Sequence, residues 1–316
     1  MKSKNILFNF KKKKLKKIIV IGEIFEDIFA EVKITKISPE APVMVISPKN
    51  NIKTYLGGAG NVLQNLLSAK LNVRLISLAE DNKLKFINKN SRNKIDFLFD
   101  KKYKNIKKIR YVSNNKHIIR IDHEKTYNFP LKKNKEIIQL LKKNLKNSDT
   151  IIFSDYNKGF LTNFNIPESL SLINKNKNIK IFVDSKRSNL EIFKNVYLIK
   201  INNLEACDYF KIKNVYDTLN YKKIYDFLKH NNINYLIITT GKDGAILFYK
   251  NKFKYIFNKK KKDVFDVSGA GDTFLSYLVY ANMNGLDIKK SIQIANQASF
   301  LAISKYGISS IKISDL

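Results

Sequence analysis

The sequence is poor in cysteine, in long apolar runs and in arginine, and each shortage argues against a class of protein. Cys207 is the single cysteine among 316 residues, so no internal disulfide framework exists and the composition suits a reducing compartment. No apolar run approaches the roughly 20 residues that a membrane-spanning helix needs. We therefore expect a cytoplasmic protein without a membrane partner. A chain this long can bury about 75% of the surface its unfolded form exposes, so it needs no covalent staples.

Acidic residues are also scarce relative to basic ones. The chain has 59 Lys and Arg against 27 Asp and Glu, a formal net charge of +32. A charge of this size favours a basic nucleic-acid-binding protein as one alternative. However, only five of the basic residues are arginines, although phosphates and base edges favour arginine. The lysines are dispersed over the whole chain, so we expect no nucleic-acid partner.

Short apolar runs alternate with helical patterns along most of the chain. Residues 1–16 form a lysine-rich basic tail, and the acids Glu23, Glu26 and Asp27 end the first apolar run before it reaches signal-peptide length. The predicted strands are Lys17–Ile21, Arg74–Leu78, Thr150–Ser154, Ile181–Asp184, Tyr197–Lys200 and Tyr235–Thr239. The predicted helices are Asn61–Ala69, Asn134–Lys146, Asn203–Phe210, Tyr221–His230, Asp272–Asn284 and Asp287–Lys305. This alternation predicts an α/β fold, with a mainly parallel sheet covered by helices on both faces.

Two stretches interrupt the alternation. Val32–Tyr55 holds three of the five prolines, and Ile106–Asp122 reads as two strands around a turn at residues 113–115. We expect them to form a small β lid, inserted at about 32–55 and 106–122 into a single domain over residues 17–316. Strands in such a lid have unpaired edges, which pairing with a second subunit would cover.

Glycine is scarce, with eleven residues, yet five of them lie in two clusters, 57–60 and 269–271. The second cluster leads directly into a predicted helix, where successive backbone N–H groups can bind an anionic oxygen. Asp272 lies at that helix start, where a carboxylate can accept the proton of a hydroxyl that attacks a phosphoryl group. The same pattern also fits a capped helix in which Asp272 serves only the helix dipole.

Other phosphate and metal signatures are missing. The sequence has no G-x-x-x-x-G-K-[ST] match, which excludes a P-loop enzyme. Its three histidines, His117, His123 and His230, are scattered, and no Cys/His metal cluster is present.

The segments LGGAGNVLQNL (residues 56–66) and DVSGAGDTF (residues 266–274) resemble the two glycine signatures of the ribokinase/PfkB carbohydrate kinases. Residues 202–205 resemble the family's N-x-x-E element and residues 239–244 its nucleotide loop, in the same order along the chain. The resemblance extends from about Lys17 to Ile311. It implies a ribokinase-like three-layer α/β/α sandwich with a β lid, and an ATP-dependent sugar kinase that uses Mg²⁺. It also implies a homodimer formed through the lid.

At a finer level, KISPEAPV (residues 36–43), IIRID (118–122) and SDYNKG (154–159) resemble the bacterial heptose 7-phosphate kinases. Those enzymes phosphorylate the anomeric hydroxyl of the phosphosugar D-glycero-D-manno-heptose 7-phosphate, on the route to ADP-heptose for the lipopolysaccharide core. Many are fused to an adenylyltransferase, whereas this sequence ends at Leu316, so the resemblance implies the kinase alone. The alternatives are another PfkB-type kinase, for ribose, fructose or a fructose phosphate, and an inactive sugar-binding module.

The resemblance also assigns roles to individual residues. It implies that Asp272 is the catalytic base and that Gly269, Ala270 and Gly271 form an anion hole. The implied sugar-binding residues are Glu23, Asp27, Gly57, Gly58 and Asn61, with Arg110, Arg120, Lys158 and Lys186 as candidates for the 7-phosphate. The implied ATP-site residues are Asn202, Glu205, Thr239, Gly241, Gly244, Ser268 and Asn296, of which Glu205 acts indirectly on Mg²⁺.

Four features depart from the family pattern. Glu23 stands where the heptose kinases usually have aspartate, and its extra methylene would shift a sugar contact by about 1 Å. Ser268 replaces threonine and Ser185 replaces a proline, while residues 78–93 are shorter than expected.

Overall fold

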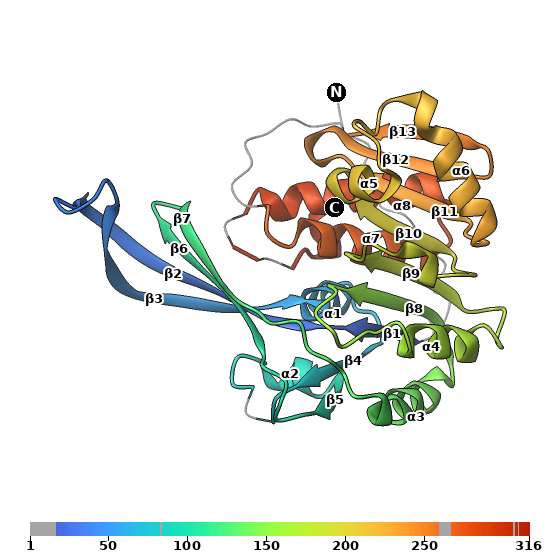
Figure 1. Cartoon of the computed structure of the whole chain (residues 1–316), viewed down its shortest axis with the longest axis horizontal. Helices are drawn as coiled ribbons and strands as arrows, with labels where there is room; N and C mark the ends of the chain where they lie inside the picture. The colour runs from blue at the N-terminus through green and yellow to red at the C-terminus, as the bar shows by residue number, and fades with distance from the viewer. Residues whose placement is uncertain (1–16, 83, 259–266, 306, 309) are drawn as a thin grey trace.

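A large sheet forms the centre of the molecule. The computed structural model describes residues 17–82, 84–258, 267–305, 307–308 and 310–316, so the predicted basic tail, residues 1–16, lies outside the described residues. The nine strands follow the order β13-β12-β11-β10-β9-β8-β1-β4-β5, and all run in one direction except β12, which is antiparallel to both of its neighbours (Figure 1). Their bounds are β1 Lys17–Gly22, β4 Val73–Ala79, β5 Ile95–Phe99, β8 Ser148–Asp155, β9 Lys180–Ser185, β10 Leu198–Asn202, β11 Tyr235–Thr239, β12 Gly244–Tyr249 and β13 Lys252–Phe257.

Helices cover both faces of this sheet. The first strand shows why, because its side chains alternate between two cores: Ile18 and Val20 pack in one, Ile19 and Ile21 in the other. The core of Ile18 includes residues of α1 (Ala59–Ser68), α7 (Ala270–Met283) and α8 (Ile288–Ile303). The core of Ile19 includes residues of α3 (Asn134–Leu145), α4 (Asn165–Ile173), α5 (Asn203–Phe210) and α6 (Tyr221–His230). The expected three-layer α/β/α sandwich is therefore confirmed.

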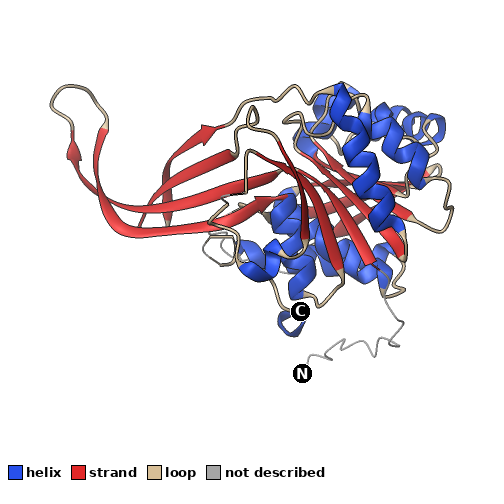
Figure 2. Cartoon of the chain, turned by 90° about the horizontal axis from the view of Figure 1, so that it is seen from below, coloured by secondary structure: helices blue, strands red, loops and turns tan. Residues whose placement is uncertain are grey.

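A second sheet projects from the body as a long curved lid (Figures 1 and 2). Its strands are β2 (Ile24–Ile37), β3 (Met44–Gly58), β6 (Ile106–Ser113) and β7 (Lys116–His123), in the order β3-β2-β6-β7. The lid begins earlier than the predicted Val32, because β2 follows β1 with only Glu23 between them. β1 and β2 thus form an almost continuous strand that runs from the core of the body into the lid.

Most predicted elements are present, and the differences have simple causes. The helices Asn203–Phe210 and Tyr221–His230 and the strand Tyr235–Thr239 match their predicted bounds. Sequence analysis missed β5, β12, β13 and α4, and also the short α2 (Lys89–Arg92). In the antiparallel hairpin β12–β13 at the sheet edge, lysines interrupt the apolar residues of β13 (KFKYIF), whereas β12 (GAILFY) does carry the apolar run of a buried strand and was overlooked. None of the described helices has both the length and the apolarity to cross a membrane.

The carboxyl ends of the parallel strands meet at one edge of the large sheet. Chain segments that follow these strands supply Glu23 after β1, Tyr156 after β8 and Lys186 after β9. At the same edge β10 and β11 end at Asn202 and Thr239. Ligands of open α/β sheets bind beyond the carboxyl ends of the strands, so this edge is where a site is expected.

Candidate active site

Asp272 lies in the first turn of α7, which follows Gly269. Its carboxylate is buried: Oδ2 accepts a hydrogen bond from Asn61 Nδ2 at 3.1 Å, and Oδ1 accepts one from the Tyr156 hydroxyl. Burial raises the pKa of Asp272 to about 6, and the nearby charge of Asp184 raises it too, whereas the two hydrogen bonds lower it. A carboxylate in this state is ionised at neutral pH and more basic than an exposed one, as a general base requires.

The glycine turn before Asp272 is adapted to close approach. Gly269 has φ 75°, and a Cβ there would lie 2.5 Å from Asn61 Nδ2. A Cβ at Gly271 would lie 3.0 Å from Nζ of Lys200, which donates at 2.7 Å to Asp184 Oδ2. Ala270 is the first residue of α7, and Ser268 lies in the turn that leads into it. The helix start, which has no side-chain cap, therefore combines its first backbone N–H groups with an adjacent buried ammonium group, a suitable environment for an anionic oxygen.

Sequence analysis missed Lys200, Asp184 and Tyr156. A signal for Lys200 was present, because a lysine in the middle of the apolar run of β10 must be buried and therefore paired. Asp184 ends the apolar run of β9 in the same way, one residue before Ser185. Tyr156 gave no such signal, since its contact with Asp272 joins residues 116 positions apart.

A pocket of about 450 Å³ opens beside this helix start. Its lining includes the four predicted nucleotide residues Thr239, Gly241, Gly244 and Asn296, together with Ala270 and Gly271 of the turn. Side chains of α7 and α8 give it an apolar wall: Phe274, Phe300 and Ile303. The size and the mixed lining fit a purine nucleotide whose phosphates would point to Gly271.

Asn202 and Glu205 lie at the start of α5, where they form a capping box. Asn202 Oδ1 accepts from the Glu205 N–H at 2.8 Å, and Glu205 Oε2 accepts from the Asn202 N–H at 2.8 Å. Glu205 Oε1 accepts from Lys186 Nζ at 3.2 Å. Among the described residues no cluster of three or more His, Cys, Asp or Glu side chains could hold a metal by itself. Asp184 and Glu205 both lie beside Lys186, and carboxylates in such a position can assist Mg²⁺ that is held mainly by nucleotide phosphates and water.

The lid brings its own polar residues to the site. Asp27 on β2 forms a buried ion pair with Arg110 on β6. A Cβ at Gly57 would lie 1.8 Å from Asp27 Oδ2, so this carboxylate lies against the bare backbone of β3. Gly58, with φ 61°, begins the turn into α1, which carries Asn61. The predicted sugar-binding residues Asp27, Gly57, Gly58 and Asn61 are thus close together.

The four predicted phosphate-binding cations all have acidic partners. Arg110 pairs with Asp27, Arg120 with Asp122 at 2.9 Å, Lys158 with Glu124 at 2.6 Å and Lys186 with Glu205. Glu124 also pairs with Lys108 at 3.2 Å, a cation that sequence analysis missed. Lys186 differs from the other three, because its ammonium group lies near Asp272. It is beside Glu205 and 5.2 Å from the centre of the Tyr156 ring.

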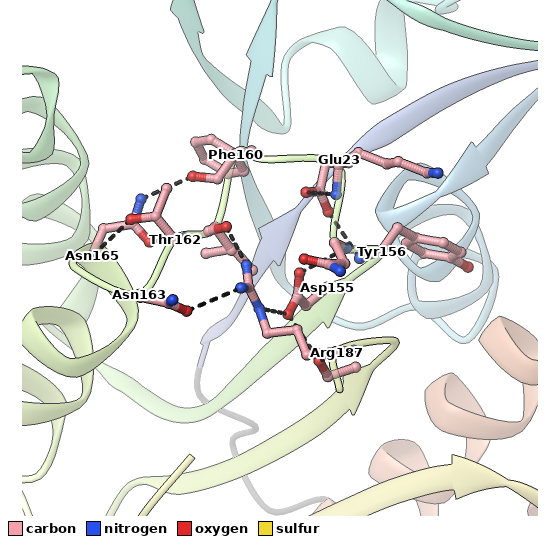
Figure 3. Close-up of polar contacts among 12 residues, drawn as sticks. Glu23, Asp155, Tyr156, Phe160, Thr162, Asn163, Asn165 and Arg187 are labelled. Carbon is pink, nitrogen blue, oxygen red and sulfur yellow. Dashed lines mark hydrogen bonds and ion pairs between the residues drawn. The ribbon is translucent and has the colours of Figure 1, made fainter. Parts of the chain in front are cut away.

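Glu23 is fully buried and faces backbone N–H groups (Figure 3). Its Oε2 accepts from the Tyr156 N–H at 3.0 Å and its Oε1 from the Lys158 N–H at 3.2 Å. Burial and the neighbouring Asp155 carboxylate raise the pKa of Glu23 to about 7. The extra methylene of Glu23 therefore reaches the loop after β8, and both carboxylate oxygens are engaged there.

Comparison with known proteins agrees with this geometry. The model of the pfkB family carbohydrate kinases matches residues 15–314. The chain belongs to this family. It is accordingly an ATP-dependent carbohydrate kinase, as the glycine signatures predicted.

Relatives of this pfkB kinase include two proteins named bifunctional protein HldE. The one from Campylobacter concisus is 36% identical over 308 residues and the one from Aliarcobacter butzleri 31% over 306; each alignment covers 95% of this chain. The chain spans 63% of the length of each of these relatives. Among solved structures, phosphofructokinase-2 from Escherichia coli shares the fold, with a TM-score of 0.75 at 13% identity, over 95% of this chain and 96% of the other.

The burial of Glu23 predicts a pH-dependent stability difference. The ordinary pKa of a glutamate is 4.5, whereas the pKa of Glu23 in the folded protein is about 7. Between these two pH values, the folded state of this pfkB kinase holds a proton that the unfolded state has released. Hence the Glu23 contribution to the free energy of unfolding is complete below this window and is lost as the pH rises through it. Glu23→Gln lacks this dependence, so the stability advantage of the wild type over the variant should shrink from about pH 5 to about pH 8.

Urea denaturation at several pH values measures this difference. Glu136→Gln, at an exposed position of α3, serves as the matched control. A difference between wild type and Glu23→Gln that stays constant or grows with pH would contradict the prediction.

Proposed function

We propose that this chain transfers the γ-phosphoryl group of ATP to the anomeric hydroxyl of D-glycero-D-manno-heptose 7-phosphate, giving the 1,7-bisphosphate. The step would belong to the synthesis of ADP-heptose for lipopolysaccharide core. The observation that carries the proposal is the position of Asp272, a buried carboxylate with the nucleotide pocket on one side and the lid residues Asp27 and Arg110 nearby. The HldE relatives and the KISPEAPV segment support the choice of sugar.

The proposed chemistry is a direct transfer. Asp272 accepts the proton of the sugar hydroxyl as its oxygen attacks the γ-phosphorus in line with the departing ADP oxygen. Backbone N–H groups of residues 269–271 and the ammonium group of Lys200 stabilise the negative charge on the transferring oxygens. Closure of the lid over the sugar excludes water, which limits hydrolysis of ATP.

Mg²⁺ is the metal that we propose for this site. Bound to the nucleotide, it neutralises part of the charge on the β- and γ-phosphates. Asp184 and Glu205 would face it through water, and Lys186 would stay paired with Glu205 to keep that carboxylate in place. Although burial disfavours its charge, the carboxylates of Asp184, Glu205 and Asp272 raise the pKa of Lys186, so its ammonium group remains charged.

Replacing the proposed base provides a direct test. Asp272→Asn keeps the shape of the side chain but removes the proton acceptor, so turnover should fall by about 10²–10⁴-fold. Binding of ATP and of the sugar, measured by calorimetry, should persist. Asp208→Asn, on the exposed surface of α5, is the control. Normal turnover in Asp272→Asn would remove this residue from the mechanism.

The substrate is tested by ADP release with Mg-ATP and four acceptors: heptose 7-phosphate, fructose 6-phosphate, ribose and fructose. We expect turnover with heptose 7-phosphate alone. Turnover confined to another acceptor would keep the kinase and Asp272 but overturn the choice of sugar. No turnover with any acceptor, from a folded protein that binds sugar, would favour the inactive sugar-binding module.

We also propose a cytoplasmic homodimer that forms through the lid. Strand register places Ile52, Ala30, Tyr111 and Ile119 in one row across the four strands. This row lies on the face opposite Asp27 and Arg110, because neighbouring residues of a strand alternate between faces. Ile52 and Ile119 are 65% and 52% exposed, and an apolar sheet face of this kind is readily covered by a second copy.

Substitution of charged residues into this row should dissociate the dimer into monomers. The double variant Ile52→Asp/Ile119→Asp introduces four like charges per interface, and sedimentation velocity should show the mass of one chain instead of two. Leu219→Asp, at a fully exposed position of the body, should leave the mass unchanged. A monomeric wild type, or a dimer that survives the double substitution, would refute assembly through this face.

A further inference from the structure

Asp272 is held at both of its carboxylate oxygens, and only one of the two donors belongs to a glycine signature. Asn61 holds Oδ2 from the start of α1. Tyr156, a residue with no role in the mechanism proposed above, holds Oδ1 from the loop between β8 and α4. A carboxylate oxygen has two acceptor positions, so each oxygen of Asp272 keeps one for an incoming hydroxyl.

The loop that carries Tyr156 has a fixed and unusual backbone. Asn157 and Gly159 both have positive φ, 56° and 99°. A Cβ at Gly159 would lie 1.7 Å from the carbonyl oxygen of Tyr127, so only glycine fits there. The conformation is held from one side by Glu23, whose carboxylate accepts the N–H groups of Tyr156 and Lys158 (Figure 3).

A second buried carboxylate holds the loop from the other side. Asp155 accepts from the Arg187 guanidinium and, at 2.8 Å, from the Ser185 hydroxyl, and its other oxygen accepts from the Asn157 N–H at 3.0 Å. Arg187 also donates to the carbonyl oxygen of Leu161, further along the same segment (Figure 3). Glu23 and Asp155 thus fix the backbone before and after Tyr156.

The tyrosine ring is fixed as well. It packs edge-on against Phe25 of the lid, with ring centres 4.5 Å apart, and the Lys186 ammonium group lies 5.2 Å from its centre. Burial raises the pKa of the Tyr156 hydroxyl, and the charges of Asp272, Asp184 and Asp27 raise it further. The hydroxyl therefore keeps its proton and can only donate to Asp272.

We propose that Tyr156 is a positioning residue: its hydroxyl fixes the orientation of the Asp272 carboxylate and stabilises the ionised form that accepts the substrate proton. The inference rests on the proposed role of Asp272 as the base. It assigns a function to the buried network of Glu23, Asp155 and Arg187, which holds the loop so that this hydroxyl reaches α7.

The pH dependence of the reaction follows from the groups around Asp272. The groups that face it are the Asn61 amide, the Tyr156 hydroxyl, the Asp184 carboxylate and the ammonium groups of Lys200 and Lys186. When the Tyr156 donor is removed, only Asn61 and Lys200 still counteract the effects of burial and of Asp184 on the pKa of Asp272. The pKa of Asp272, already near 6, must then rise.

Tyr156→Phe tests this predicted rise in the pKa of Asp272. It removes the hydroxyl and keeps the ring, with its contact to Phe25 and its cation–π contact to Lys186. The acid limb of the kcat/KM profile, measured with the sugar that supports turnover, should move up by about one pH unit, because a hydrogen bond to a charged group has about that effect. kcat at the plateau should fall by about tenfold, because the carboxylate is less well oriented. KM for ATP should be unchanged.

Tyr127→Phe is the matched control, since it removes a tyrosine hydroxyl that donates to the Asp100 carboxylate at 2.6 Å outside the site. Its profile should coincide with that of the wild type. A chemically more acidic phenol, 3-fluorotyrosine incorporated at position 156, donates a stronger hydrogen bond and should move the acid limb down. This second variant keeps the test valid if Tyr156→Phe does not fold.

A measurement without turnover separates this inference from the proposed function. In protein labelled with ¹³C at aspartate carboxyls, the Asp272 signal, identified by its loss in Asp272→Asn, should titrate at higher pH in Tyr156→Phe than in the wild type. An unchanged titration and an unchanged acid limb would overturn the role of Tyr156 and leave the kinase assignment intact. A shifted titration in a protein that phosphorylates none of the sugars would support Tyr156 and overturn the proposed substrate.

Discussion

The burial of one carboxylate, that of Asp272, sets the requirements that the surrounding structure meets. Removing a charged carboxylate from water is costly unless hydrogen bonds and opposite charges replace the water. Here the replacements come from three separate segments: Asn61 at the start of α1, Tyr156 after β8, and Lys200 on β10, whose ammonium group is also paired with Asp184 of β9. Only a sheet that places the ends of β8, β9 and β10 side by side, next to the starts of α1 and α7, can bring them together.

The same sheet explains why the lid and the body both contribute residues to one site. β1 and β2 are nearly continuous, so the chain that leaves the large sheet between β8 and β4 also carries Asp27 into the lid. At the bend between them, Glu23 turns inward to the loop after β8 instead of outward to solvent. The lid, the β8 loop and the base on α7 are therefore joined through buried hydrogen bonds, and a displacement of one of them strains the others.

Sequence alone predicted the layers and picked out four residues that line the pocket beside α7, and physical reasons explain what it missed. Gly269 is visible because its positive φ and close approach to Asn61 favour glycine, and the run of apolar strands is visible because both faces are covered. The partners of Asp272 are not visible in this way. Tyr156 becomes its partner only through the tertiary fold, and nothing in the local pattern SDYNKG distinguishes a tyrosine that donates to a catalytic carboxylate from one that fills a core. The contacts of Glu23 were not visible either: both its carboxylate oxygens accept from backbone N–H groups of the loop after β8, which lies 133 residues or more away along the chain.

The net charge of +32 is a poor guide to the chemistry of the site. Arg110, Arg120, Lys158, Lys108 and Lys186 each pair with an acid within the described structure, and most of these pairs are at least half-buried. A phosphate that enters this region must therefore exchange with a carboxylate instead of finding an open cation. Such an exchange is open only to a charged ligand, since a neutral sugar cannot take the place of a carboxylate beside a cation. Under the proposed function, the phosphate of the sugar would replace one of these carboxylates, whereas ribose or fructose would leave the pairs intact.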